Sequence, residues 1–231
     1  MAFTTTLFLF IGLPVTVSIY YLISMLKYKV KDTHFINRYR LDDVWLVLIN
    51  SVFYSWALTS DVYRFWIYII FVYMVGCAIH YYKEIPLNHD NQSSGLIRRH
   101  QVILAMAIII VLIILINFKY TEIFAGLINW LLKTNFKGHN VIAPLGISFI
   151  TFSAISYLTD ISCGKAKKGN LIDFALYMSF FPKVVSGTIV LWRDFKIQTK
   201  GQRVTLDDVS NGTTRIMIGF AKKLILIIGI L

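Results

Sequence analysis

The stretch that decides the fold is APLGISFITFSAISYLTD, from Ala143 to Asp160. It is close to the roughly 20 apolar residues that a helix needs to cross a membrane. It nevertheless contains a proline, a glycine and several hydroxyl side chains, and it ends on an acid. The segment can therefore be either a lipid-facing anchor or one wall of a functional site.

A helical wheel at about 100° per residue divides this stretch into two faces. One face is apolar apart from Thr151 and carries Ile147, Ile150, Ala154, Ile155 and Leu158. The other face carries Ser148, Phe149, Phe152, Ser153, Ser156, Thr159 and Asp160. We expect the apolar face to contact lipid. The second face either packs closely against other helices through its hydroxyls or borders a polar cavity.

The composition places the chain in a membrane. Its residues are 57% hydrophobic and only 15% charged, whereas soluble proteins have about a quarter charged residues. The net charge of +11 does not indicate nucleic acid, because the basic residues lie in short loops between apolar runs, as expected for membrane orientation. The two cysteines lack CxxC or Cys/His spacing, so no metal site is predicted.

The apolar runs predict an all-α, polytopic membrane protein. Runs near the length of a span are 7–26, 44–58, 62–82, 102–117, 141–159 and 171–192. The segment 121–132 is too short to cross, and we expect it to form a helix in the membrane interface. Basic residues concentrate in segments 27–43, 83–101 and 160–170. This pattern predicts that these segments are cytoplasmic and that the N-terminus is outside.

The run 171–192 breaks this alternation of sides. It carries Pro182, Lys183 and Gly187 near its middle, and a lysine at the bilayer centre costs about 2.5–3.5 kcal/mol. A full crossing would also put the basic segment that begins at Arg193 outside. We therefore predict a re-entrant hairpin that turns between Pro182 and Gly187 and returns to the cytoplasm.

The last apolar run is short. Only eight apolar residues follow Lys222 and Lys223, far fewer than the roughly 20 of a span. We expect residues 1–231 to be the N-terminal portion of a single, longer transmembrane domain, although a short helix lying on the membrane is an alternative.

Four blocks of this sequence resemble the membrane-bound O-acyltransferase family, in the bacterial branch that modifies alginate and teichoic acids. NVIAPLGISFITFSAISYLTDI is similar to its LPLGISFxTFQxLSYxxDV block, and NSVFYSWAL is similar to its second span. LIDFALYMSFFPKVVSGTIVLWRDF and GFAKKLILI resemble its FFPxLxxGPI and KK blocks, in the same order. Ser153, Thr188 and Leu191 depart from the residues usual in that branch.

The resemblance implies an O-acyltransferase in the bacterial inner membrane. It would transfer an acyl group, typically acetyl, from acetyl-CoA or another cytoplasmic thioester to a hydroxyl of an extracytoplasmic polysaccharide or cell-wall polymer. It also allows an extracytoplasmic acyl-relay protein as a partner, and it implies no bound cofactor. The catalytic histidine of the family lies beyond the KK block, so we expect no catalytic residue in this chain and no activity from residues 1–231 alone.

Two groups of candidate site residues follow from this interpretation. Ser148, Phe149, Phe152 and Ser156 are expected to line a cavity. Pro182, Lys183, Gly187 and Arg193 are expected to form a donor-side hairpin, where the two cations would attract the phosphates of coenzyme A.

Two other classes of function remain open at this point. An ion-coupled transporter would usually place carboxylates at mid-membrane, and here Asp61, Asp160 and Asp173 all lie at the edges of apolar runs. A non-catalytic membrane subunit that docks a partner enzyme also fits a chain without the expected catalytic group.

Overall fold

The computed structural model describes residues 11–29, 41–57, 62–84, 93–120, 129, 131, 146–186, 189–199 and 205–228. These residues are almost entirely helical, and no strand occurs among them. The all-α prediction is therefore confirmed for the described part of the chain. The predicted interfacial helix at 121–132 lies outside the described residues apart from Asn129 and Leu131.

The chain divides into two compact units, one made of Met1–Asp42 and Gly201–Leu231 and the other of Asp43–Lys200. The first unit contains α1 (Leu13–Lys29) and α11 (Leu206–Ile228). Thr205 begins α11: its backbone N–H donates to Asp208 Oδ2 at 2.9 Å and its hydroxyl at 2.7 Å. The Asp208 N–H in turn donates to Thr205 Oγ1 at 3.2 Å, which satisfies a backbone donor of the first turn. The bonds from Thr205 hold the pKa of the Asp208 carboxyl below its ordinary value.

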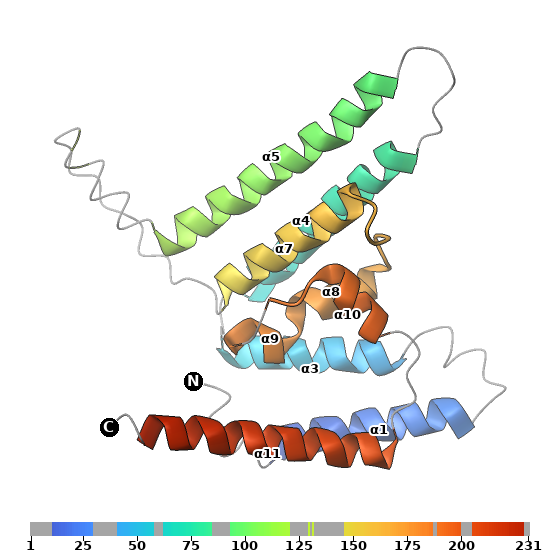
Figure 1. The fold of residues 1–231 in the computed structure, drawn as a ribbon, viewed down its shortest axis with the longest axis vertical. Helices are drawn as coiled ribbons and strands as arrows, with labels where there is room; N and C mark the ends of the chain where they lie inside the picture. Colours follow the sequence, from blue (N-terminus) through green and yellow to red (C-terminus); the bar gives the residue numbers. More distant parts are fainter. Residues whose placement is uncertain are drawn as a thin grey trace. The chain divides into compact units, whose positions relative to one another are not determined.

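The second unit is built on three long or buried helices that pack pairwise, α4 (Val62–Glu84), α5 (Ser93–Lys119) and α7 (Ile147–Ser162) (Figure 1). Two segments, Val62–Glu84 and Arg99–Lys119, are long and apolar enough to cross a membrane. Most of their residues are not buried inside the protein. Only 28% of an apolar 18-residue stretch of the first segment is buried, and 17% of such a stretch of the second. Their outward faces therefore present apolar surface.

The unit also contains all but the first two residues of α3 (Leu41–Ala57). Its other helices are short: α8 (Leu171–Ser179), α9 (Phe181–Ser186) and α10 (Trp192–Gln198). The run 171–192 is thus divided between two helices that are separated at Phe180, and neither is long enough to cross a bilayer. Pro182 occupies the first turn of α9, where a proline costs no helix hydrogen bond.

The apolar face of α7 is packed inside the protein. Ile150, Ala154 and Leu158 are 3%, 0% and 0% exposed, and α7 packs against both α4 and α5. The prediction that this face contacts lipid is wrong. Apolar residues suit a protein interior as well as a bilayer, so the wheel alone could not separate the two.

Candidate functional site: the junction of α7, α8, α9 and α10

The polar face of α7 holds the beginning of α10. The first backbone N–H groups of a helix have no partner within the helix, and the residue before α10, Leu191, has no side chain that can accept a hydrogen bond. Ser156 Oγ accepts from the Trp192 N–H at 3.2 Å, and Asp160 Oδ2 accepts from the Arg193 N–H at 3.2 Å. Because Ser156 and Asp160 are four residues apart, they lie on the same face of α7.

Trp192 is the centre of this junction and is completely buried. Its ring lies edge-on to Tyr157 and Tyr177, with centroids 5.1 Å and 5.2 Å away. Its indole Nε1–H donates to the Lys167 carbonyl at 3.1 Å. This contact connects α10 to the loop at 163–170.

Gly169 allows that loop to pass close to the tryptophan. Its φ of +71° is a conformation that other residues rarely adopt, and a Cβ there would lie 2.9 Å from Trp192 Cζ2. Tyr73 of α4 donates its hydroxyl to the Gly169 carbonyl at 3.3 Å. The loop is therefore fixed between α4 and α10.

Lys183 of α9 is buried against aromatic rings. Its side chain is only 6% exposed, and Nζ lies 3.2 Å from the centroid of Tyr177 and 5.8 Å from that of Phe195. Nζ has no hydrogen-bond partner among the described residues. A ring face attracts a cation, but it does not replace the hydrogen bonds that an ammonium group makes in water.

Tyr177 connects this lysine to α7. Its hydroxyl lies 2.9 Å from the Val190 carbonyl and 3.4 Å from the Ser153 carbonyl, and it can donate to either. Lys183, Tyr177, Ser156 and Trp192 are thus joined by direct contacts. We refer to these four residues with Asp160, Arg193 and Phe195 as the junction.

Basic side chains lie in the loop at 163–170 and reach it from α4 and α10. Lys83 Nζ donates to the Ser162 carbonyl at 2.8 Å, and Lys196 Nζ donates to the Lys167 carbonyl at 2.9 Å. We call this group the basic rim, and it consists of Lys83, Lys165, Lys167, Lys168, Arg193 and Lys196. Asp194 lies 3.6 Å from Arg193, but a pair this exposed is worth at most about 1 kcal/mol. The rim therefore remains positive and suited to anions.

The structure brings together only part of the predicted site. Ser156, Lys183 and Arg193 lie in the junction. Pro182 is exposed in α9, and Gly187 lies outside the described residues.

The rest of the predicted cavity wall lies apart from the junction contacts. Ser148 accepts from Lys119 Nζ of α5 at 3.4 Å, Phe149 is half-buried and Phe152 is 45% exposed.

Sequence reasoning did not single out Tyr177 or Trp192 as site residues. Both lie within or beside an apolar run where aromatic residues are common, so their position gave no signal. Among the described residues, no group of three His, Cys, Asp or Glu side chains could hold a metal ion. Of the described histidines, His80 contacts Glu84 at 3.3 Å and His100 lies on α5, and neither is one of the junction residues.

Curated proteins similar to this chain are O-acetylating enzymes. A probable alginate O-acetylase of Pseudomonas aeruginosa is 29% identical over an alignment of 228 positions that covers 96% of this chain and 39% of that protein. The probable alginate O-acetylase of Pseudomonas syringae pv. tomato is 30% identical with the same coverage. A peptidoglycan O-acetyltransferase of Helicobacter pylori is 27% identical over an alignment of 254 positions, gaps included, that covers 98% of this chain and 44% of that protein.

The similarity covers nearly all of this chain, but the chain spans only about two fifths of the length of these relatives. No protein-family model matches the chain, and no solved structure matches it.

Proposed function

Because nearly all of the chain is similar to O-acetylating enzymes, we propose that it belongs to the membrane-bound O-acyltransferase family and forms part of an enzyme that acetylates hydroxyls of an extracytoplasmic polysaccharide or cell-wall polymer. The observation that carries this proposal is similarity over 96% of the chain to enzymes named for O-acetylation. The two kinds of relative act on alginate and on peptidoglycan, as their names state. Both names support a polymer acceptor for this chain.

The protein works in the bacterial inner membrane as a multi-pass protein with its N-terminus outside. The two candidate spans and their outward apolar surface support this location. The division of 171–192 into α8 and α9 supports the re-entrant hairpin, because two short helices joined at Phe180 can enter and leave on one side. The basic rim then lies on the cytoplasmic side, in agreement with the charge rule.

The donor approaches this basic rim from the cytoplasm. Coenzyme A carries several phosphate groups, and a patch of six basic side chains raises the local concentration of such an anion. Arg193 lies where α10 begins, and the buried Lys183 lies 5.8 Å from the ring of Phe195 on the same helix. We assign the rim and Lys183 to the donor side.

The reaction is an acyl transfer. A base removes the proton of the acceptor hydroxyl, its oxygen bonds to the thioester carbonyl carbon, and the carbon–sulfur bond breaks. The thiolate leaves and takes up the proton, which gives an ester and a free thiol. We propose that the base is the histidine expected from the family resemblance, outside residues 1–231. This chain supplies donor binding and a wall of the site.

Coenzyme A binding by the chain in lipid nanodiscs tests this assignment. The double variant Arg193→Gln with Lys196→Gln is expected to weaken binding by about tenfold at low salt and less at high salt, because salt screens exposed charges. Lys119→Gln is the matched control, since Lys119 contacts Ser148 on α7 rather than the rim, and it should bind as the unchanged chain does.

Absence of coenzyme A binding, or an equal loss in the control, would contradict the donor-side assignment. The same preparation should form no acetyl ester from acetyl-CoA and polysaccharide. Robust transfer would show that the base lies within residues 1–231.

A further inference from the structure

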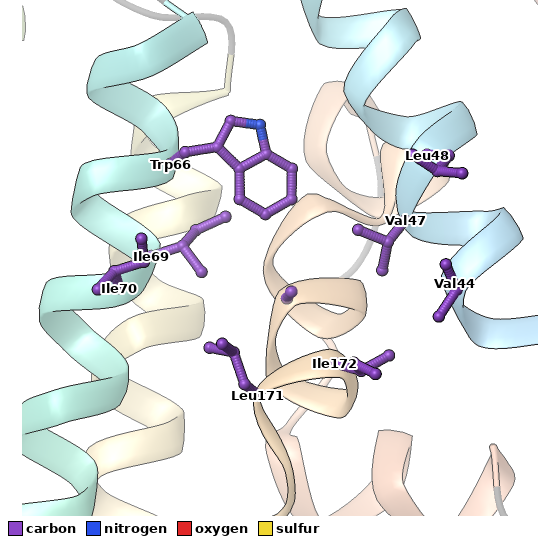
Figure 2. A pocket seen from close by; sticks show the side chains of 9 residues that line it. Val44, Val47, Leu48, Trp66, Ile69, Ile70, Leu171 and Ile172 are labelled. Atoms are coloured by element: carbon purple, nitrogen blue, oxygen red, sulfur yellow. The ribbon is translucent and has the colours of Figure 1, made fainter. Parts of the chain in front are cut away.

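An apolar groove lies between α3, α4 and α8, and it shares no residue with the junction (Figure 2). Its volume is about 250 Å³. Each of the three helices contributes three side chains, which are Val44, Val47 and Leu48, Trp66, Ile69 and Ile70, and Leu171, Ile172 and Ala175. All of the lining residues belong to the unit Asp43–Lys200.

The groove reaches from the protein interior to the surface. At its floor, Ile69 and Ala175 are 0% and 6% exposed and belong to the hydrophobic core. At its mouth, Leu48, Ile70 and Leu171 are 55%, 44% and 46% exposed. An apolar molecule can therefore enter from outside without any rearrangement of the core.

Water is a poor occupant of this space. A bound water needs two to four polar partners, and the lining side chains are aliphatic apart from the indole of Trp66. An empty groove would leave its walls without contacts on one side and lose dispersion energy. The chemistry of the walls favours an apolar occupant over water.

The mouth of the groove is continuous with the apolar outer surface of a candidate membrane span. On α4, Tyr63, Ile67, Ile70 and Met74 follow one another at helical spacing and are 44–61% exposed. Ile70 belongs both to this stripe and to the groove wall. Whatever covers this stripe of α4 therefore also contacts the mouth of the groove. If α4 spans a membrane, the stripe is covered by lipid alkyl chains.

We propose that this groove binds one alkyl chain of a bilayer phospholipid. The proposal rests on the membrane location given under the proposed function, and it is independent of acetyl transfer. The bound chain fills the gap between α3 and α8 and joins the two helices to α4.

Photolabelling of the whole chain in nanodiscs tests the proposal. The probe is a phosphatidylcholine that carries a diazirine near the end of one acyl chain, and adducts are located by mass spectrometry. We expect adducts on Val47 and Ile172 in the groove and on Met74 in the stripe. Ala175→Leu fills the groove from its floor, and Leu48→Trp covers its mouth from an exposed position where folding is not at risk.

Both variants should reduce labelling of Val47 and Ile172 at least about fivefold and leave Met74 unchanged. Val52→Phe is the matched control, because Val52 is 64% exposed on α3 and does not line the groove, and it should label like the unchanged chain. Labelling of Met74 without Val47 and Ile172, or groove labelling that survives both variants, would overturn the proposal.

Two further outcomes would also overturn it. Crosslinks between two copies of the chain through Val47 or Ile172 would show that a protein surface occupies the groove. Absence of labelling at Met74 as well would show that α4 does not contact lipid and would contradict the membrane location. A failure of acetyl transfer alone would not affect the groove proposal.

Discussion

A side chain at position 76 would collide with the ring of Tyr157. A Cβ added to Gly76 would lie 2.8 Å from Tyr157 Oη and 2.9 Å from Cζ, closer than real Cβ contacts allow. Tyr157 cannot move aside easily, because it is fully buried and packs on Phe174 with centroids 4.1 Å apart. Gly76 therefore allows α4 and α7 to approach each other closely.

Gly76→Ala is expected to destabilise the protein. Alanine is favoured over glycine in a helix by about 1 kcal/mol, but the strain of overpacking costs about 1–3 kcal/mol, so the steric effect should dominate. Gly219→Ala on α11 is the control, because a Cβ there meets nothing within 4 Å. Unfolding in detergent with increasing denaturant should give a lower midpoint for Gly76→Ala only. A higher midpoint for Gly76→Ala would show that the ring adjusts freely.

At the level of elements, α10 depends on α7 for its N-terminal hydrogen bonds. Asp160→Ala removes the acceptor of the Arg193 N–H, and an unsatisfied buried donor costs about 1–3 kcal/mol. Asp160→Asn keeps a carbonyl oxygen at the same place and should lose less. Hydrogen exchange of the amides at 192–195 should become faster in Asp160→Ala than in Asp160→Asn.

Asp194→Ala serves as the control for this experiment. Asp194 is on the same helix, but its side chain is half exposed and its pair with Arg193 is a surface contact, so its removal should have little effect. Equal exchange in Asp160→Ala and Asp194→Ala would mean that the Asp160 cap contributes nothing to α10.

Part of this arrangement could be predicted from the sequence. The long run 62–82 corresponds closely to α4 because continuous apolar residues of that length leave few alternatives. The turn predicted between Pro182 and Gly187 is wrong in its position, because Pro182 and Lys183 lie inside α9 and the chain breaks before them, at Phe180. Proline fits the first turn of a helix, so it marks a helix start here, and the re-entrant topology stays a prediction. The cap on α10 could not be predicted, because its acceptors precede it by 36 and 33 residues and its donors are backbone groups common to most residues.

At the scale of the whole molecule, the natural thiols offer a test of the topology. Cys163 is exposed in the loop between α7 and α8, and Cys77 is half-buried in α4. In a Cys77→Ser background, a membrane-impermeant maleimide added to intact cells should not label Cys163. Labelling should begin when the membrane is permeabilised, because the basic loop is predicted to be cytoplasmic.

A second thiol position tests the hairpin in the same experiment. With both natural cysteines replaced by serine, Asn211→Cys should show the same protection as Cys163, since a re-entrant 171–192 returns the chain to its original side. If Asn211→Cys is labelled from outside while Cys163 is protected, the run 171–192 crosses the membrane completely.

The bond from the Arg193 N–H to Asp160 has a consequence for sequence divergence. The carboxylate contacts a backbone group, so it is indifferent to the side chain that position 193 carries, and any residue except proline can donate the same bond. The side chain at position 193 can then change its charge while α10 stays in place. Mutational scanning of the two positions should find broad tolerance at 193 for folding and narrow tolerance at 160.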